Sequence, residues 1–63
     1  MIGVYFTNGD KVLYQNAVGY EYKGDMQLFI LATGTNKRIM IPRENVLDIG
    51  FVKEPIEGEF LYE

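Results

Sequence analysis

Apolar and polar residues alternate in short runs along most of this chain, and this alternation restricts its fold more than any other feature. In 2–6 apolar side chains occupy every second position, and 18–23 repeats the pattern with valine and tyrosine. Side chains of a β-strand point alternately to opposite faces, so a period of two predicts strands that are buried on one side. No stretch of twelve residues holds a helical period. The sequence therefore predicts an all-β fold.

The residues between the first two predicted strands mark a tight turn. Asn8 and Gly9 both tolerate the positive φ angles that a two-residue type I′ turn requires. We therefore expect residues 2–6 and 11–14 to form an antiparallel hairpin.

In that register both faces of the hairpin carry apolar or aromatic side chains. Tyr5, Val12 and Tyr14 would share one face. The simpler interpretation is that tyrosine tolerates exposure, because its hydroxyl group stays hydrated. The alternative is that this face is an interface, because contiguous aromatic patches mark association surfaces. A chain of 63 residues can bury only a small core, so we favour the interface and predict a homo-oligomer.

A second hairpin is expected in the middle of the chain. Gly24 and Asp25 suit a two-residue type II′ turn, which would place Tyr20 opposite Phe29. This arrangement leaves open which face of the hairpin is buried. A bulge at Gly19 would reconcile the two strands.

The following residues predict further strands and one helical turn. Residues 38–41 form a short strand that ends at Pro42, because proline cannot donate a hydrogen bond to a sheet. Arg43–Asn45 has the length of one 3-10 turn, and alternation resumes in 47–51. We interpret the whole as a five-stranded small barrel, with the 3-10 turn before the last strand and the twist of the sheet bringing its edges together.

The order of these elements resembles an SH3-like barrel. The stretch from Ile41 to Val46, with its four-residue step from Pro42 to Val46, resembles the segment that precedes the last strand of SH3 domains. The chain departs from SH3 domains because it has no Trp, and Asn45 stands where their proline-peptide groove has an aromatic residue. The resemblance therefore implies the fold and not polyproline binding. Sm-like barrels share this shape, which adds RNA binding as an alternative.

The residue types that most enzymes and metal sites need are absent from the sequence. The chain has no His, no Cys and no Ser. It therefore lacks the usual pairs of nucleophile and base, the ligands of common zinc sites, and any disulfide. We predict a protein that is not an enzyme and has no metal and no cofactor.

No segment has the pattern of a membrane span or a signal peptide. The longest apolar run, 28–32, is too short to cross a bilayer. The first residues lack a basic start followed by a long apolar run. We therefore expect a cytoplasmic protein without a membrane partner.

Lys37, Arg38 and Arg43 are the main concentration of basic residues. Beside aromatic residues such as Tyr20 and Tyr22, they would form a stacking and phosphate site for a nucleotide or single-stranded RNA. The simpler interpretation is an exposed edge strand, on which Lys and Arg discourage pairing with other sheets. We favour the edge strand and keep nucleotide or nucleic-acid binding as the alternative function.

The excess negative charge belongs to the end of the chain. Residues 1–52 hold five basic and five acidic residues, whereas 53–63 hold one Lys and four Glu, which accounts for the net charge of −3. Phe60, Leu61 and Tyr62 stand among these acids. We divide the chain into a barrel, 1–52, and an acidic-aromatic tail, 53–63. The tail docks as a strand on its own or a neighbour's sheet, engages a foreign partner, or frays.

These features together predict a non-catalytic interaction protein. We expect a self-associating adaptor, or an inhibitor that occludes a protein partner, since clustered carboxylates can occupy a basic groove. Its expected interface comprises Tyr5, Val12 and Tyr14 with the three apolar residues of the tail. In size and style the chain resembles the small acidic proteins that bacteriophages carry.

Overall fold

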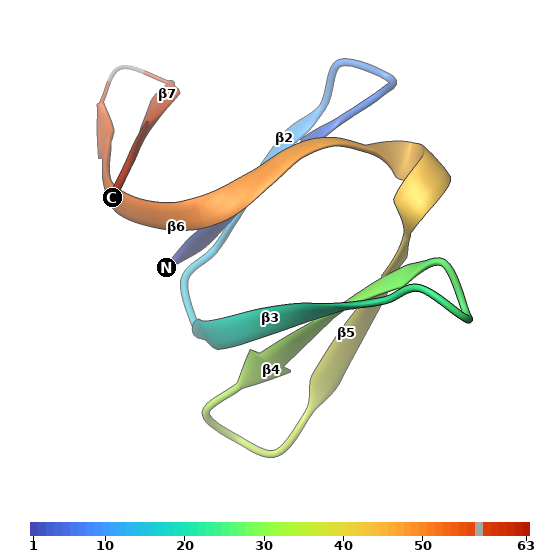
Figure 1. Cartoon of the computed structure of the whole chain (residues 1–63). Helices are drawn as coiled ribbons and strands as arrows, with labels where there is room; N and C mark the ends of the chain where they lie inside the picture. The colour runs from blue at the N-terminus through green and yellow to red at the C-terminus, as the bar shows by residue number, and fades with distance from the viewer. Residues whose placement is uncertain (57) are drawn as a thin grey trace.

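Seven β-strands and one 3-10 helix make up the computed structural model, which describes residues 1–56 and 58–63 (Figure 1). The elements are β1 (Ile2–Phe6), β2 (Lys11–Tyr14), β3 (Ala17–Lys23), β4 (Leu28–Thr33), β5 (Arg38–Pro42), η1 (Arg43–Asn45), β6 (Val46–Ile56) and β7 (Glu59–Tyr62). The strands form two antiparallel sheets. The first sheet has the order β2-β1-β6-β7, and the second has the order β3-β4-β5.

The core lies between the two sheets. Its buried residues are Ile2 and Val4 from the first sheet and Ala17, Leu31 and Ile41 from the second. The face of each sheet that carries these residues is called its inner face below. The core is small, as the length of the chain predicts, so each of these side chains carries a large share of the stability.

The all-β prediction is confirmed, but the five-stranded barrel is not. The structure has seven strands where the sequence predicted five, because the alternating segments before the tail form six strands, one more than predicted, and the tail contributes the seventh. Among the described residues, no strand pairing joins the first sheet to the second. The described chain therefore forms two facing sheets and not a closed barrel.

The first hairpin differs from the predicted register by one residue. Its loop has three residues, since the Phe6 N–H donates to the Asp10 carbonyl at 2.8 Å and the Gly9 N–H donates to the Phe6 carbonyl at 3.0 Å. Gly9 has a φ of +94°, as the bulge position of such loops requires. Val4 consequently pairs with Val12.

The second hairpin also has a longer loop than predicted. The prediction that Tyr20 faces Phe29 is wrong: Tyr22 pairs with Phe29, because the loop comprises residues 24–27 and not two residues alone. The expected bulge near Gly19 is present as a shift of register between β3 and β4.

The 3-10 turn predicted at Arg43–Asn45 is confirmed. It follows directly on Pro42, the last residue of β5, and Val46 begins β6. The Thr7 N–H donates to the Asn45 carbonyl at 2.9 Å, which ties the turn to the loop of the first hairpin.

The C-terminal tail docks on the protein's own sheet. β6 continues to Ile56, and β7 returns antiparallel to it, with Val52 opposite Tyr62 and Ile56 opposite Glu59. Figure 1 shows this hairpin bent to the side of the first sheet that faces away from β3, β4 and β5. Of the alternatives considered for the tail, the structure therefore shows the one in which it docks as a strand on its own sheet.

Candidate functional site

Two glycines make a flat floor on the outer face of the first sheet. Gly3 and Gly50 pair directly across β1 and β6. A Cβ atom at Gly50 would lie 2.8 Å from Tyr62 Cδ1, and a Cβ atom at Gly3 would overlap the ring of Phe60. Glycine at both positions therefore lets these two rings lie directly on the strands.

Three aromatic rings pack together above this floor and are called the tail cluster. Tyr5 comes from β1, and Phe60 and Tyr62 come from β7. The ring centroid of Tyr5 lies 5.2 Å from that of Phe60, in an edge-to-face arrangement, and 6.5 Å from that of Tyr62. Such aromatic pairs stabilise beyond the area that they bury, so the tail cluster holds β7 against the sheet.

Lys11 links the turn before β7 to the same cluster. Its ammonium group donates to the carbonyl of Gly58 at 2.5 Å and lies 5.8 Å from the ring centroid of Tyr5. A cation over an aromatic face is attracted to it. This places a base beside the acidic tail.

The hydroxyl group of Tyr62 is buried and has no hydrogen-bond partner among the described residues. Burial raises the pKa of Tyr62 to about 12, and the negative charge of Asp48 adds to that increase. An unpaired buried hydroxyl costs about 1–3 kcal/mol, so ring packing and not a polar contact of this group keeps Tyr62 in place.

The structure separates residues that the sequence placed on one face. In the corrected register Val12 lies opposite Val4, and Tyr14 lies opposite Ile2, so Val12 and Tyr14 belong to the inner face. Tyr14 packs against the core, and burial raises its pKa. Tyr5 points the other way, into the tail cluster. The prediction that these residues share a face is therefore wrong, because the loop is one residue longer than expected.

The third apolar residue of the tail has a different environment. Leu61 is 44% exposed, whereas Phe60 and Tyr62 are half-buried. A hollow of about 470 Å³ beside β7 is lined by Leu61, Ile56, Glu59 and Phe60. The outer side of β7 therefore offers accessible apolar surface.

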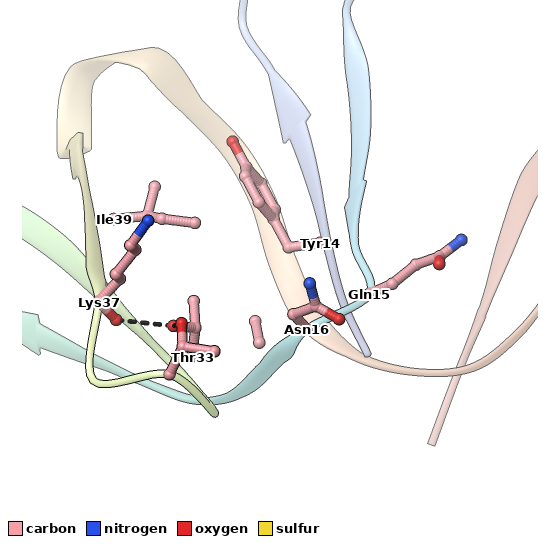
Figure 2. Close-up of a pocket in the computed structure, with 8 residues that line it drawn as sticks. Tyr14, Gln15, Asn16, Thr33, Lys37 and Ile39 are labelled. Carbon is pink, nitrogen blue, oxygen red and sulfur yellow. Dashed lines mark hydrogen bonds between the residues drawn. The ribbon is translucent and has the colours of Figure 1, made fainter.

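The predicted basic residues do not converge. Lys37 lines a cavity of about 400 Å³ between the β2–β3 connection and the β4–β5 hairpin. Figure 2 shows Lys37 and Ile39 on one side of this cavity and Tyr14 on the other. The Thr33 hydroxyl donates to the Lys37 carbonyl at 3.0 Å and so closes the end of the hairpin.

Arg38 lies elsewhere. It lines a separate hollow of about 260 Å³, together with Glu21 and Tyr20. Arg43 belongs to η1, beyond the end of β5. Of the residues predicted to form a nucleotide site, only Arg38 and Tyr20 line one hollow of the described surface. Even these two side chains lie on opposite faces of the sheet, because Tyr20 pairs with Leu31 of the core and Arg38 pairs with Ala32.

Tyr20 and Tyr22 belong to an aromatic row that spans both sheets. Tyr22 lies 5.0 Å from Phe29, and Tyr20 lies 5.3 Å from Phe51, measured between ring centroids. Phe51 comes from β6, far from β3 in the sequence, so the alternation pattern did not reveal this contact. The row joins the sheets along an open side, where Phe51 and Tyr22 stay more than 40% exposed.

No family model, no curated protein and no solved structure matches this chain. Within residues 1–56 and 58–63, no group of three or more acidic side chains is placed to hold a metal ion. In the same part of the chain, no helix is long and apolar enough to cross a membrane. The function must therefore be inferred from the surfaces described above.

Proposed function

We propose that this chain is a non-catalytic protein-binding module that associates with further copies of itself, and that acts as an adaptor or by occluding a partner. The observation that carries the proposal is its exposed apolar surface. Ten large apolar side chains of the described residues are exposed. They are Met1, Val12, Val18, Tyr22, Met26, Met40, Leu47, Phe51, Ile56 and Leu61.

Several of these side chains are neighbours. Ile56 and Leu61 line one hollow beside β7, and Tyr22 and Phe51 stand in one aromatic row. Apolar surface gains about 25 cal/mol for each Å² removed from water. Because the core is small, burial of such surface against another copy adds a contribution that the single chain cannot supply.

We also infer that the two sheets are an open variant of the SH3-like fold. Support comes from the order of the elements along the chain. Two hairpins are followed by a short strand that ends at Pro42, by the 3-10 turn Arg43–Asn45, and by the long strand β6. Folds of this class serve many functions, so the likeness adds no partner of its own.

Nucleotide or single-stranded RNA binding is the alternative function. Its support is the hollow that Arg38 and Tyr20 both line. Their side chains leave opposite faces of the second sheet, because Tyr20 pairs with Leu31 of the core and Arg38 pairs with Ala32. The separation of Lys37 and Arg43 from that hollow weighs against it, because phosphate binding relies on several bases acting together.

Sedimentation equilibrium over a range of protein concentrations tests the proposal. We expect the average mass to rise above the 7.3 kDa of one chain as concentration increases. A mass of one chain at every concentration would overturn self-association. Binding of a labelled RNA oligonucleotide that weakens steeply with added salt would favour the alternative function.

A further inference from the structure

We infer that copies of this chain join head to tail, by pairing the free edge of β7 in one copy with the free edge of β5 in the next. This inference rests on the self-association proposed above and names the surfaces that perform it. Within the described strands, β7 ends the first sheet and β5 ends the second. The edge of a sheet presents backbone groups that can pair with another chain.

The two edges carry the same pattern with opposite charge. Each has an apolar centre between charged ends. The framing residues are Glu59 and Glu63 around β7, and Lys37, Arg38 and Arg43 around β5. Pairing two β7 edges, or two β5 edges, would bring like charges together, whereas pairing β7 with β5 brings opposite charges together. The charges therefore select one partner for each edge.

The two edges of one copy cannot meet. Figure 1 shows β7 and β5 at opposite ends of the molecule, and they belong to different sheets. Pairing between them therefore requires a second copy. Such a contact leaves one edge free at each end, so further copies add until the assembly closes into a ring or remains an open fibre.

Backbone hydrogen bonds show which groups of β5 face outward. The Arg43 N–H donates to the Gln27 carbonyl at 2.9 Å, and the Lys37 carbonyl accepts from the Thr33 N–H at 3.1 Å, both towards β4. Successive residues of a strand direct their backbone groups to opposite edges. The even-numbered residues of β5 therefore direct their backbone groups to the free edge.

The same reasoning applies to β7. The Glu63 N–H donates to the Phe51 carbonyl at 3.0 Å, towards β6. The backbone groups of Phe60 and Tyr62 therefore point to the free edge. The Phe60 N–H donates to the hydroxyl of Tyr5 at 3.5 Å, which is long for a hydrogen bond and weaker than a sheet pairing would be.

One antiparallel register satisfies the backbone of both edges. It places Met40 of one copy opposite Phe60 of the next, and Arg38 opposite Tyr62, so that all four outward-facing N–H groups of the two strands find a partner. Met40 is 60% exposed in the single copy, and this pairing covers it. The Arg38 side chain would then lie beside the ring of Tyr62, where a cation is favourable.

The same register also matches the charges. Lys37 falls directly opposite Glu63. Arg43 falls diagonal to Glu59, within reach of a long side chain. The register was chosen on the backbone groups, and it keeps the charge complementarity that selects the two edges.

Reversing the charges on one edge at a time tests this pairing. The acid-reversed variant carries Glu59→Lys and Glu63→Lys, and the base-reversed variant carries Lys37→Glu and Arg43→Glu. In each variant the β5 and β7 edges carry charge of the same sign and repel each other. At protein concentrations at which the parent associates, each variant alone is therefore expected to have the mass of one chain. In an equal mixture each variant's β5 meets the other's β7 with opposite charge, and association is expected to return.

A variant without any change of charge provides a second test. The Met40 N–H points away from β4, so Met40→Pro leaves the pairing of β4 with β5 intact but blocks the free edge. Loss of association in a folded Met40→Pro variant supports the inference. If circular dichroism shows that a charge-reversed variant is unfolded, Met40→Pro replaces it as the test of the β5 edge.

Three results separate the possible failures. Folded variants that associate as the parent does would overturn the head-to-tail pairing while leaving self-association intact. An equal mixture of folded charge-reversed variants that stays at the mass of one chain would overturn it as well. A parent that is itself a single chain at every concentration would overturn the proposed self-association, and this pairing with it.

Discussion

Replacing Leu31 with alanine is expected to unfold most of the protein at room temperature. Leu31 is fully buried at the centre of the core. Truncating such a leucine costs about 2–5 kcal/mol, which includes the cavity left behind. A single core in a chain shorter than about 70–80 residues rarely supplies more than about 3–5 kcal/mol. Urea unfolding followed by circular dichroism measures the loss.

Leu47→Ala is the matched control, because it makes the same chemical change at a side chain that is 72% exposed. Its stability is expected to stay within about 0.5 kcal/mol of the parent. Equal unfolding midpoints for the two leucine variants would show that the core does not lie where the structure has it.

Replacing Gly3 with alanine is expected to lower the stability by about 1–3 kcal/mol and to lift β7 from the sheet. The new Cβ would overlap the ring of Phe60 and lie 2.7 Å from Val52 Cγ2. Val52 is buried and cannot move aside easily, so Phe60 must give way. Thermal unfolding measures the loss, and near-ultraviolet circular dichroism reports the release of the tail cluster.

Gly19→Ala makes the same substitution in open space. No atom lies within 4 Å of a Cβ built at Gly19. Alanine restricts the unfolded chain, so this variant is expected to match the parent or to gain up to about 1 kcal/mol. If Gly3→Ala unfolds at the same temperature as Gly19→Ala, then β7 does not lie on the glycine floor.

The elements that could be predicted from the sequence are those that short-range patterns determine. Alternation over 2–6 and 18–23 reflects burial on one face, and both segments lie in strands. Pro42 ends β5 because it lacks an N–H group, and the 3-10 turn follows at once. The interpretation of residues 38–41 as part of an edge strand is also confirmed, since β5 ends its sheet.

The registers could not be predicted because they depend on loop geometry. Asn8 and Gly9 suit a two-residue turn, but they also suit the three-residue loop that the structure has. The side chain of Asn8 accepts a hydrogen bond from the Asp10 N–H at 3.0 Å, which supports the longer loop. A shift of one residue exchanges the two faces of a strand, so Val12 changed sides.

The docking of the tail depends on residues that are far apart in the sequence. The apolar residues of the tail indicated that it has a role, but Gly3 and Gly50 form their floor only once β1 and β6 pair. The sequence held one signal for this floor, which is a glycine between apolar residues, on the face opposite to them, in each of the segments 2–6 and 47–51. The unpaired edges of β5 and β7 likewise follow from the sheet order, which no local pattern contains.

Amide hydrogen exchange at low and high protein concentration tests the head-to-tail account most directly. The backbone amides of Arg38, Met40, Phe60 and Tyr62 are expected to exchange more slowly at the concentrations where the mass rises, because they then donate to the neighbouring copy. The amide of Leu31, which lies inside the second sheet, is the internal control and is expected to change little. If the four edge amides exchange at the same rate while the mass rises, the copies join by another surface and the account is wrong.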